Sequence, residues 1–447
     1  MAKQNLRARS VTLDLWKVRM LAARQGLKNF KTFEAGFYHY QDLPADSGNS
    51  SPYKAWHGKK LDRHRATEIA LFLGEAGYVP LLPAQPPNLH FPELLVWDRH
   101  YSPPGALLKA EYGIVPFHQR KAELESLQAW CDRPERIGVR LYTGAGGMGK
   151  TRLAIELCHR MARAQGWAGG FLQPLCWQAD PFAWLLAETR PVLIVVDHAE
   201  TRHRELSACL RAVLGSQTRV RVMLLARAVE DWWVRLKTEP QGVGDLLMGQ
   251  ASRQFDLKPL LLQRQEREAS WLLATESFAR QLQQPAVVQL PENITAPHFE
   301  QVLFLHMQAL ITIGGRYQEH GLDGILEVVL NRERHFWEQQ LHNRRLPPQF
   351  LAAVGTALAR ITRLGGAASP GEARLALQDI PVLADGKAHE LQALTELLHC
   401  IYPGRTINAR PLSQGRYVDP LEPDVLGEYL WREERRRAGE DFPGPGG

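Results

Sequence analysis

The sequence lacks any run of eighteen apolar residues, although 45% of its 447 residues are hydrophobic. A helix needs about 20 mostly apolar residues to cross a bilayer, so no membrane-spanning helix is indicated. Residues 1–10 are polar and basic, and no apolar signal core follows them. We therefore expect a cytoplasmic protein with no membrane partner.

Cysteine is also scarce, and no two cysteines have the spacing of a metal site or a redox motif. The odd number of five argues against a framework of disulfides. We expect reduced, buried thiols, as is usual in the cytosol. The five are Cys131, Cys158, Cys176, Cys209 and Cys400.

Net charge is absent outside the N-terminal segment. Residues 1–80 contain 13 Lys and Arg against 7 Asp and Glu, whereas the remainder contains 41 of each. The whole formal charge of +6 therefore lies in residues 1–80. A basic module on a neutral body indicates an anionic partner for that module.

What is present divides the chain by pattern. After a proline-rich stretch, apolar strand-like segments alternate with helical ones, which indicates a parallel sheet covered by helices; farther on the pattern is only helical. The expected parts are a basic helical module (1–80), a proline-rich linker (81–106), an α/β domain (107–260), a helical extension (261–345), a second C-terminal domain (346–431) and a flexible tail (432–447).

Three apolar segments of the α/β region predict buried strands: Ile137–Thr143, Pro191–Asp197 and Val220–Arg227. A short final strand is expected at Phe255–Pro259, and a helix at Thr151–Gln165. Parallel strands end at one edge of their sheet, where ligands bind in open α/β folds. Polar residues at these strand ends are therefore candidate site residues.

The segment GAGGMGKT, residues 144–151, fits the phosphate-binding pattern G-x-x-x-x-G-K-[ST]. It follows a predicted strand and opens a predicted helix, which is the setting that this pattern requires; a glycine-rich structural turn is the alternative. The glycines let backbone N–H groups point at phosphate oxygens, Lys150 is expected to reach the β- and γ-phosphates, and the Thr151 hydroxyl to ligate Mg²⁺. The expected nucleotide-binding residues are Gly144, Ala145, Gly146, Gly147, Met148, Gly149, Lys150, Thr151 and Arg152.

Two acids follow the second apolar strand. Asp197 is placed to hold Mg²⁺, directly or through water, and Glu200 to orient or deprotonate an attacking water. The alternatives are a helix N-cap for Asp197 and a solvated first-turn acid for Glu200. Arg227, at the end of the third strand, is a candidate sensor of the γ-phosphate; Arg202 is equally consistent with a surface salt bridge.

The ordered blocks VPFHQRKAEL (115–124), GAGGMGKT, VVDHAETR (195–202) and LLARAVEDWW (224–233) resemble the bacterial STAND NTPases, the signal-transduction ATPases related to NACHT and NB-ARC proteins. The blocks LFLHMQAL (303–310), VVLNRERHFW (328–337) and YVDPLEPDVLGEYL (417–430) extend the resemblance downstream. Two positions depart from the family: Gln119 stands where glycine is usual, and Val302 where proline is usual.

The resemblance implies a P-loop NTPase core with sheet order 5-1-4-3-2, a helical extension and a winged-helix-like domain that closes over the nucleotide. It implies ATP and ADP as ligands, with ADP holding a closed state and ATP an open one that forms homo-oligomers. The adenine is implied to contact Arg120 and the backbone near Phe117. Asp197 and Glu200 match the family's D-x-A-E pattern, and Arg227 its sensor arginine.

Residues 18–74 weakly resemble a repressor-type helix-turn-helix, through S-x-x-K-A-x-x-G-K at Ser51–Lys59 and a later I-A-x-x-L-G. A recognition helix there would present its basic side chains to DNA. The alternative is a helical protein-interaction module. The candidate DNA contacts are Lys54, His57, Lys59 and Lys60.

The leading hypothesis is a slow, regulatory ATPase that acts as a switch, responds to an unknown protein trigger and uses the N-terminal module as output. One alternative is an ATP-gated, DNA-binding transcription regulator. Another is a nucleotide-binding scaffold without significant turnover.

Overall fold

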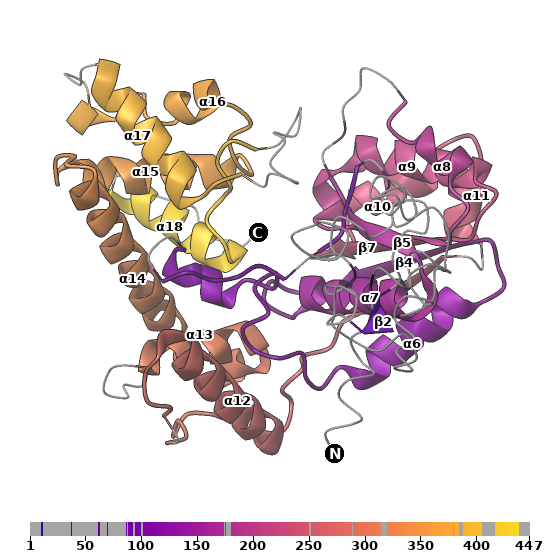
Figure 1. Ribbon diagram of the computed structural model, residues 1–447, viewed down its shortest axis with the longest axis horizontal. Coiled ribbons are helices and arrows are strands. Elements are labelled where there is room, and N and C mark those ends of the chain that lie inside the picture. Colours follow the sequence, from indigo (N-terminus) through magenta and orange to yellow (C-terminus); the bar gives the residue numbers. More distant parts are fainter. Residues whose placement is uncertain are drawn as a thin grey trace.

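The computed structural model describes residues 88–92, 94–99, 102–173, 175, 180–249, 252–287, 289–313, 320–378, 380–383, 388–404 and 416–437, with the isolated residues 10–11, 37, 61–62, 69 and 86. They form an α/β body and a helical body that lie side by side (Figure 1). None of the helices in this part of the chain combines the length and the hydropathy that crossing a bilayer requires.

The α/β body is built on a six-stranded sheet of order β3-β5-β6-β7-β4-β8. Strands β4 to β8 are parallel to their neighbours, and β3 pairs antiparallel with β5. The strands are β3 (Leu89–His90), β4 (Ile137–Thr143), β5 (Ala168–Leu172), β6 (Val192–Val196), β7 (Val220–Ala226) and β8 (Ser252–Asp256).

The observed order differs from the predicted order 5-1-4-3-2 by an additional edge strand, β3. The parallel strands β4 to β8, numbered 1 to 5 along the chain, read 5-1-4-3-2 from β8. Strand β3 arises within residues 81–106, the segment expected to be a linker. Its docking depends on Gly170, because a β-carbon there would lie 2.2 Å from the His90 carbonyl oxygen.

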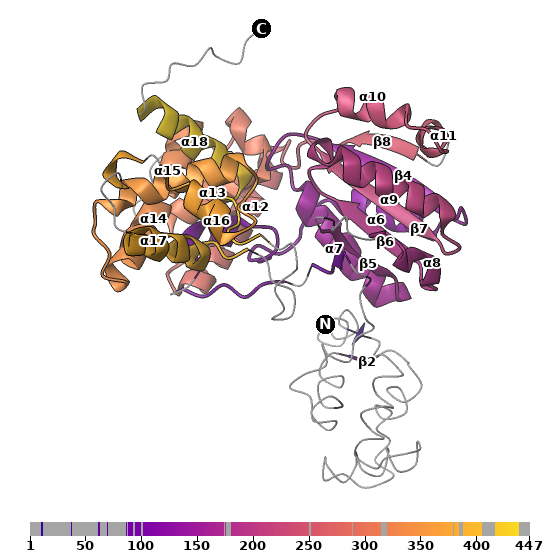
Figure 2. The same ribbon diagram turned by 90° about the horizontal axis from the view of Figure 1, so that it is seen from above.

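Helices cover both faces of the sheet (Figure 2). Alternate residues of β6 face opposite layers: Val192, Ile194 and Val196 pack with α9 to α11, and Leu193 and Val195 with α6 and α7. Burial on both faces explains why this strand is apolar throughout. The helices are α6 (Lys121–Asp132), α7 (Lys150–Gln165), α8 (Trp184–Ala187), η4 (Ala199–Thr201), α9 (His203–Gly215), α10 (Asp231–Lys237) and α11 (Val243–Met248).

The helical body has one continuous apolar core. In the described part of residues 346–431 the only β-structure is two isolated bridges, from Val418 to Ala367 and to Pro403. Helix α18 continues to Arg437, so residues 432–437 of the predicted tail belong to it. The helices are α12 (Arg264–Leu282), η5 (Pro297–Glu300), α13 (Val302–Thr312), α14 (Leu322–Asn343), α15 (Phe350–Arg363), α16 (Pro370–Leu375), η6 (Pro381–Leu383), α17 (Ala388–Ile401) and α18 (Asp424–Arg437).

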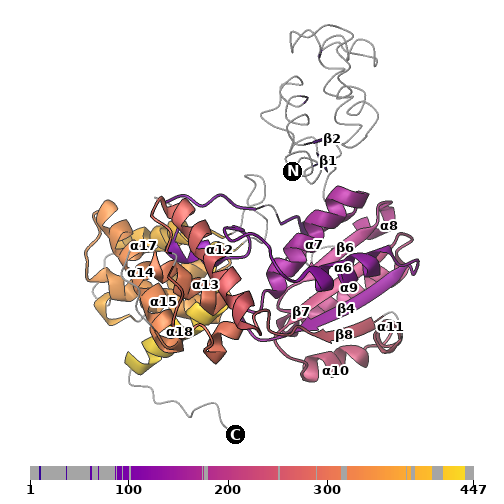
Figure 3. The same ribbon diagram turned by 90° about the horizontal axis from the view of Figure 1, so that it is seen from below.

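Residues 97–115 precede α6 in the sequence but pack into the core of the helical body. Trp97, Ala106 and Leu107 belong to that core, and η3 (Pro104–Leu108) packs against α14. Figure 3 shows this segment passing between the two bodies. The boundary expected at residue 106 therefore does not separate independent parts of the structure.

Two smaller expectations have outcomes. Cys131, Cys158 and Cys209 are buried as expected, but Cys400 is exposed on α17, which corrects the prediction of buried thiols. In the N-terminal module, Ser10–Val11 pairs antiparallel with Leu61–Asp62.

Candidate functional site

The loop between β4 and α7 has the conformation that its glycines permit. Gly147 and Gly149 have φ values of 78° and 84°, in the left-handed region that favours glycine. The loop is also tightly covered: a β-carbon at Gly147 would lie 2.8 Å from Leu303 Cβ on α13, and one at Gly146 would lie 3.2 Å from Val425 on α18. The phosphate-binding loop therefore lies where the two bodies meet.

Lys150, the first residue of α7, lies back across this loop. Its Nζ donates to the carbonyl oxygens of Gly144 at 2.6 Å and Ala145 at 3.0 Å. Burial lowers the pKa of Lys150, and the nearby carboxylates of Asp197 and Glu200 oppose this shift. The ammonium group is thus held beside the loop, near the carboxylates of Asp197 and Glu200.

Thr151 and Asp197 meet across two elements, as the sequence predicts. The Thr151 hydroxyl donates to Asp197 Oδ2 at 2.8 Å, and Asp197 Oδ1 accepts from the His198 backbone N–H at 3.0 Å. Among the described residues, no three or more His, Cys, Asp and Glu side chains group into a metal site. A hydroxyl and one carboxylate fit Mg²⁺, which uses few protein ligands and keeps waters and substrate phosphates as the others.

Glu200 lies in η4, directly after β6, and lines the same cleft. Its Oε1 accepts from the Arg227 backbone N–H at 3.4 Å. Its Oε2 is buried and has no hydrogen-bond partner among the described residues. A carboxylate with one oxygen uncommitted has the capacity to orient a water molecule.

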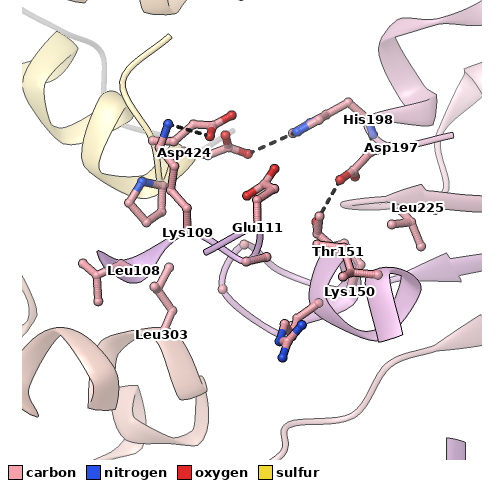
Figure 4. A pocket seen from close by; sticks show the side chains of 18 of the residues that line it. Leu108, Lys109, Glu111, Lys150, Thr151, Asp197, His198, Leu225, Leu303 and Asp424 are labelled. Atoms are coloured by element: carbon pink, nitrogen blue, oxygen red, sulfur yellow. Dashed lines mark hydrogen bonds and ion pairs between the residues drawn. The ribbon is translucent and has the colours of Figure 1, made fainter. Parts of the chain in front are cut away.

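Arg227 is bound by the opposite body through a group of side chains that we call the α18 contact: Arg227, His198, Asp424 and Glu428. Arg227 Nη2 lies 3.2 Å from Asp424 Oδ2, and its Nη1 forms an ion pair with Glu428. His198 Nε2 lies 3.6 Å from the same Asp424 oxygen. Figure 4 shows Asp424 across the pocket from Thr151 and Asp197. Burial lowers the pKa of Arg227, but the two acids outweigh it and raise that pKa overall. The predicted sensor thus engages carboxylates of α18.

The cleft between the bodies has a volume of about 1310 Å³. The loop, Asp197 and Arg227 line one wall; α13, α18 and residues 107–118 line the other. Contacts across it close to the loop include a hydrogen bond from the Leu303 N–H to the Gly147 carbonyl at 3.4 Å. A nucleotide bound at the loop would therefore touch both bodies.

Arg120, which the resemblance implies contacts the adenine, is bound to the backbone of the α/β body. Arg120 is 6% exposed, and its guanidinium donates to the carbonyl oxygens of Met148 at 3.0 Å and Lys258 at 2.8 Å. It also pairs with Glu123 at 2.7 Å. Arg120 thus fixes the phosphate loop from behind. Gln119, which replaces the usual glycine, has a φ of 58°.

Arg120 and the other predicted residues of this side, Phe117 and Arg152, line the cleft. The Arg152 guanidinium carbon lies 5.9 Å from the Phe117 ring centroid, and Val302 begins α13 beside them. His306, one helical turn farther on, was not predicted; burial lowers its pKa to about 3, so it is neutral. This end of the cleft therefore combines apolar side chains, Phe117 and Val302, with the polar groups of Arg152 and His306.

Two further predictions have outcomes of different kinds. Arg202 donates to the carbonyl oxygens of Leu172 at 2.8 Å and Gln173 at 3.0 Å, so it holds the end of β5. The candidate DNA contacts Lys54, His57, Lys59 and Lys60 lie outside the described residues.

Sequence reasoning missed Asp424, Glu428 and His198. The first two lie about 200 positions from Arg227, at sequence separations of 197 and 201. The block YVDPLEPDVLGEYL contains both acids, but only the fold brings it to Arg227.

No protein-family model matches the sequence, and no curated protein matches it either. Solved structures do match. A Walker-type ATPase of Pyrococcus abyssi is 13% identical, with a TM-score of 0.32 and coverage of 70% of this chain and 96% of that one. Cdc6p of Pyrobaculum aerophilum is 16% identical, with a TM-score of 0.31 and coverage of 74% and 98%. A STAND protein of Pyrococcus horikoshii with a tetratricopeptide repeat sensor is 14% identical, with a TM-score of 0.31 and coverage of 70% and 42%.

Proposed function

We propose that this chain is an ATP-dependent signal-transduction switch of the STAND class, which binds Mg-ATP at residues 144–151 and hydrolyses it slowly. The observation that carries the proposal is the α18 contact. The candidate phosphate sensor, Arg227, holds two carboxylates of the other body beside the phosphate-binding loop. In this proposal one side chain, Arg227, both senses the nucleotide and holds the two bodies together.

The residues around the loop have distinct roles in this proposal. Backbone N–H groups of the loop and the N-terminus of α7 bind phosphate oxygens, and Lys150 supplies positive charge. Thr151 and Asp197 would hold Mg²⁺, which when bound neutralises phosphate charge. Glu200 orients the attacking water through its uncommitted oxygen.

Switching follows from competition for Arg227. A γ-phosphate carries more negative charge than one carboxylate and offers several acceptor oxygens to a guanidinium. When it recruits Arg227, the α18 contact loses its cation, and Asp424 and Glu428 are left facing the phosphate. The bodies then separate and expose surface for a homo-oligomer. ADP lacks this phosphate and leaves the contact intact.

Lys150→Ala tests the nucleotide site. Wild type should show a rise in unfolding temperature with Mg-ATP, because a ligand that binds only the folded state stabilises it, and the variant should show none. Mass measurement with ADP and then with a non-hydrolysable ATP analogue tests the switch. A mass increase only with the analogue supports it, and an unchanged mass with both contradicts it.

Phosphate release separates a switch with turnover from a scaffold without it. Glu200→Gln should slow phosphate release by about 10²-fold or more if Glu200 acts on the water. Equal, very slow release by wild type and variant would favour the nucleotide-binding scaffold.

A DNA-binding regulator is the second candidate, because the whole net charge of +6 lies in residues 1–80. Its test is salt-dependent binding of the full chain to duplex DNA. Neutralising Lys54, Lys59 and Lys60 should weaken that binding and reduce its salt dependence. Binding unchanged by these substitutions would contradict this assignment.

A further inference from the structure

We propose that the cleft contains a second anion site, away from the phosphate loop, that binds a phosphate-bearing small molecule. It is formed by Arg363, which lies over the Trp431 ring, together with Arg416 and Arg432, and we call it the outer arginine site. All four residues line the cleft. The site goes beyond the proposed function, which assigns no ligand there.

The outer arginine site is organised by Trp431. The guanidinium carbon of Arg363, in the last turn of α15, lies 5.0 Å from the Trp431 ring centroid. That of Arg435, one turn along α18, lies 5.1 Å from it. Such a cation–π contact orients the guanidinium group of Arg363 and leaves its N–H donors available to a ligand.

Positive charge at this site is only partly neutralised within the described part of the chain. Arg363 and Arg432 are exposed, and neither has a carboxylate partner there. Arg416 has one, Asp419, at the long distance of 3.8 Å.

The acids of α18 are engaged elsewhere. Asp424 and Glu428 bind Arg227, Glu433 pairs with Arg334, and Glu434 accepts from the Thr356 hydroxyl at 2.7 Å. One helix therefore places two acids, bound to Arg227, near the phosphate loop, and places Arg432, which has no carboxylate partner among the described residues, at the outer end of the cleft.

Geometry separates the two ends. Arg432 follows Asp424 by eight residues of α18, which at a rise of about 1.5 Å per residue is roughly 12 Å along the helix. The cleft volume of about 1310 Å³ also exceeds the range of about 300–1,000 Å³ usual for a single small-molecule pocket. A nucleotide at the phosphate loop leaves room for another ligand.

The ligand class follows from the donors. Guanidinium groups match phosphate oxygens in charge and in fork geometry. Trp431 is half-buried and already carries two guanidinium groups, so it is a poor platform for stacking a nucleobase. An arginine cluster inside a cleft, without a stacking platform, favours a small phosphorylated molecule over a nucleic-acid strand.

The test uses the full chain with Lys150→Ala, which weakens phosphate binding at the loop, and inorganic tripolyphosphate as the probe in calorimetry. Tripolyphosphate should still bind at one site. Adding Arg363→Gln and Arg432→Gln should weaken binding by about tenfold or more, as expected for losing charged hydrogen bonds. Arg436→Gln, an exposed arginine of the same helix, is the matched control and should change affinity little.

Several results would overturn the proposal: no binding by the Lys150→Ala protein, or equal weakening by Arg436→Gln and the paired substitutions. Displacement of the probe by a single-stranded oligonucleotide, with the same arginine dependence, would assign the site to nucleic acid instead. Wild type gives an independent check, since it should bind two probes and lose one when Arg363 and Arg432 are changed. Failure of phosphate binding at the loop would reduce wild type to one probe and would leave the results with the Lys150→Ala protein unaffected.

Discussion

The α18 contact makes a quantitative prediction. Replacing Asp424 with Asn and Glu428 with Gln removes both carboxylates that bind Arg227 and keeps side-chain size. We expect the closed arrangement to weaken and a non-hydrolysable ATP analogue to bind more tightly, because binding then no longer has to displace the acids. The apparent affinity rises because a larger fraction of the protein is then in the conformation that binds the analogue.

Exposure sets the magnitude. The side chains of Arg227, Asp424 and Glu428 are 43%, 37% and 51% exposed, so solvent screens these pairs strongly. Exposed pairs contribute about 0.2–1 kcal/mol each, which gives about 1 kcal/mol for the two. That energy corresponds to about fivefold in affinity. High salt should mimic the substitutions in wild type, because it screens exposed pairs.

Energy transfer between dyes on the two bodies measures the opening. The exposed Cys400 on α17 takes one dye, and Gln217→Cys, an exposed position after α9, takes the other. Cys131, Cys158 and Cys209 are buried and should not react, and Cys176 is replaced by serine. The double variant should show less transfer than wild type before nucleotide is added.

A matched control makes the same change in net charge at a position away from the α18 contact. Glu268→Gln and Glu276→Gln also remove two acids, both from surface pairs within α12. They should leave transfer and analogue affinity unchanged. If the control shifts both quantities as much as the Asp424 and Glu428 variant does, net charge and not the α18 contact explains the effect. No shift with either would refute the competition for Arg227.

Three further predictions concern single residues. Burial raises the pKa of Glu333 to about 6, so the free energy of unfolding of wild type falls as the pH rises through 6. Relative to wild type, Glu333→Gln should gain about 2 kcal/mol in that free energy between pH 4 and 7. A difference in urea midpoint between the two proteins that does not change with pH would contradict this. Gly170→Val should displace β3, because a side chain there meets the His90 carbonyl; hydrogen exchange at residues 88–92 should rise sharply. Thr151→Val removes the hydroxyl bound to Asp197, so analogue affinity should become insensitive to Mg²⁺, and an undiminished Mg²⁺ effect would argue against this ligand.

The sequence was informative where local patterns determine structure. The glycines of residues 144–149 predict the phosphate-binding loop directly. The strands β4, β6 and β7 are readable because helices cover both faces of the sheet and make these strands mostly apolar. Strand β5 was missed, since its AGGFL is short and contains two glycines, which weaken a strand signal. The absence of a side chain at Gly170 lets the β3 backbone pack closely against β5. Strand β3 has only two residues and lies among prolines.

The site divides in the same way. The proximity of Thr151 and Asp197 could be predicted, because each lies at the end of an element whose sequence pattern is clear; their binding of Mg²⁺ stays a prediction. The adenine contact implied for Arg120 stays a prediction, and the two carbonyl groups of the α/β body that its guanidinium binds could not be inferred from the sequence. The partners of Arg227 could not be inferred, because nothing local to Asp424 or Glu428 records which distant cation they meet.

The path of residues 97–115 constrains how the two bodies can move. From β3 in the sheet the chain crosses to Trp97 in the helical core, returns to the α/β body at α6, and crosses again after β8 to Leu261. Three covalent crossings permit rotation about a shared axis but not full separation. The N-terminal module leads into β3, and the segment after β3 leads into the helical core, so a rotation between the bodies is transmitted to the strand that follows that module.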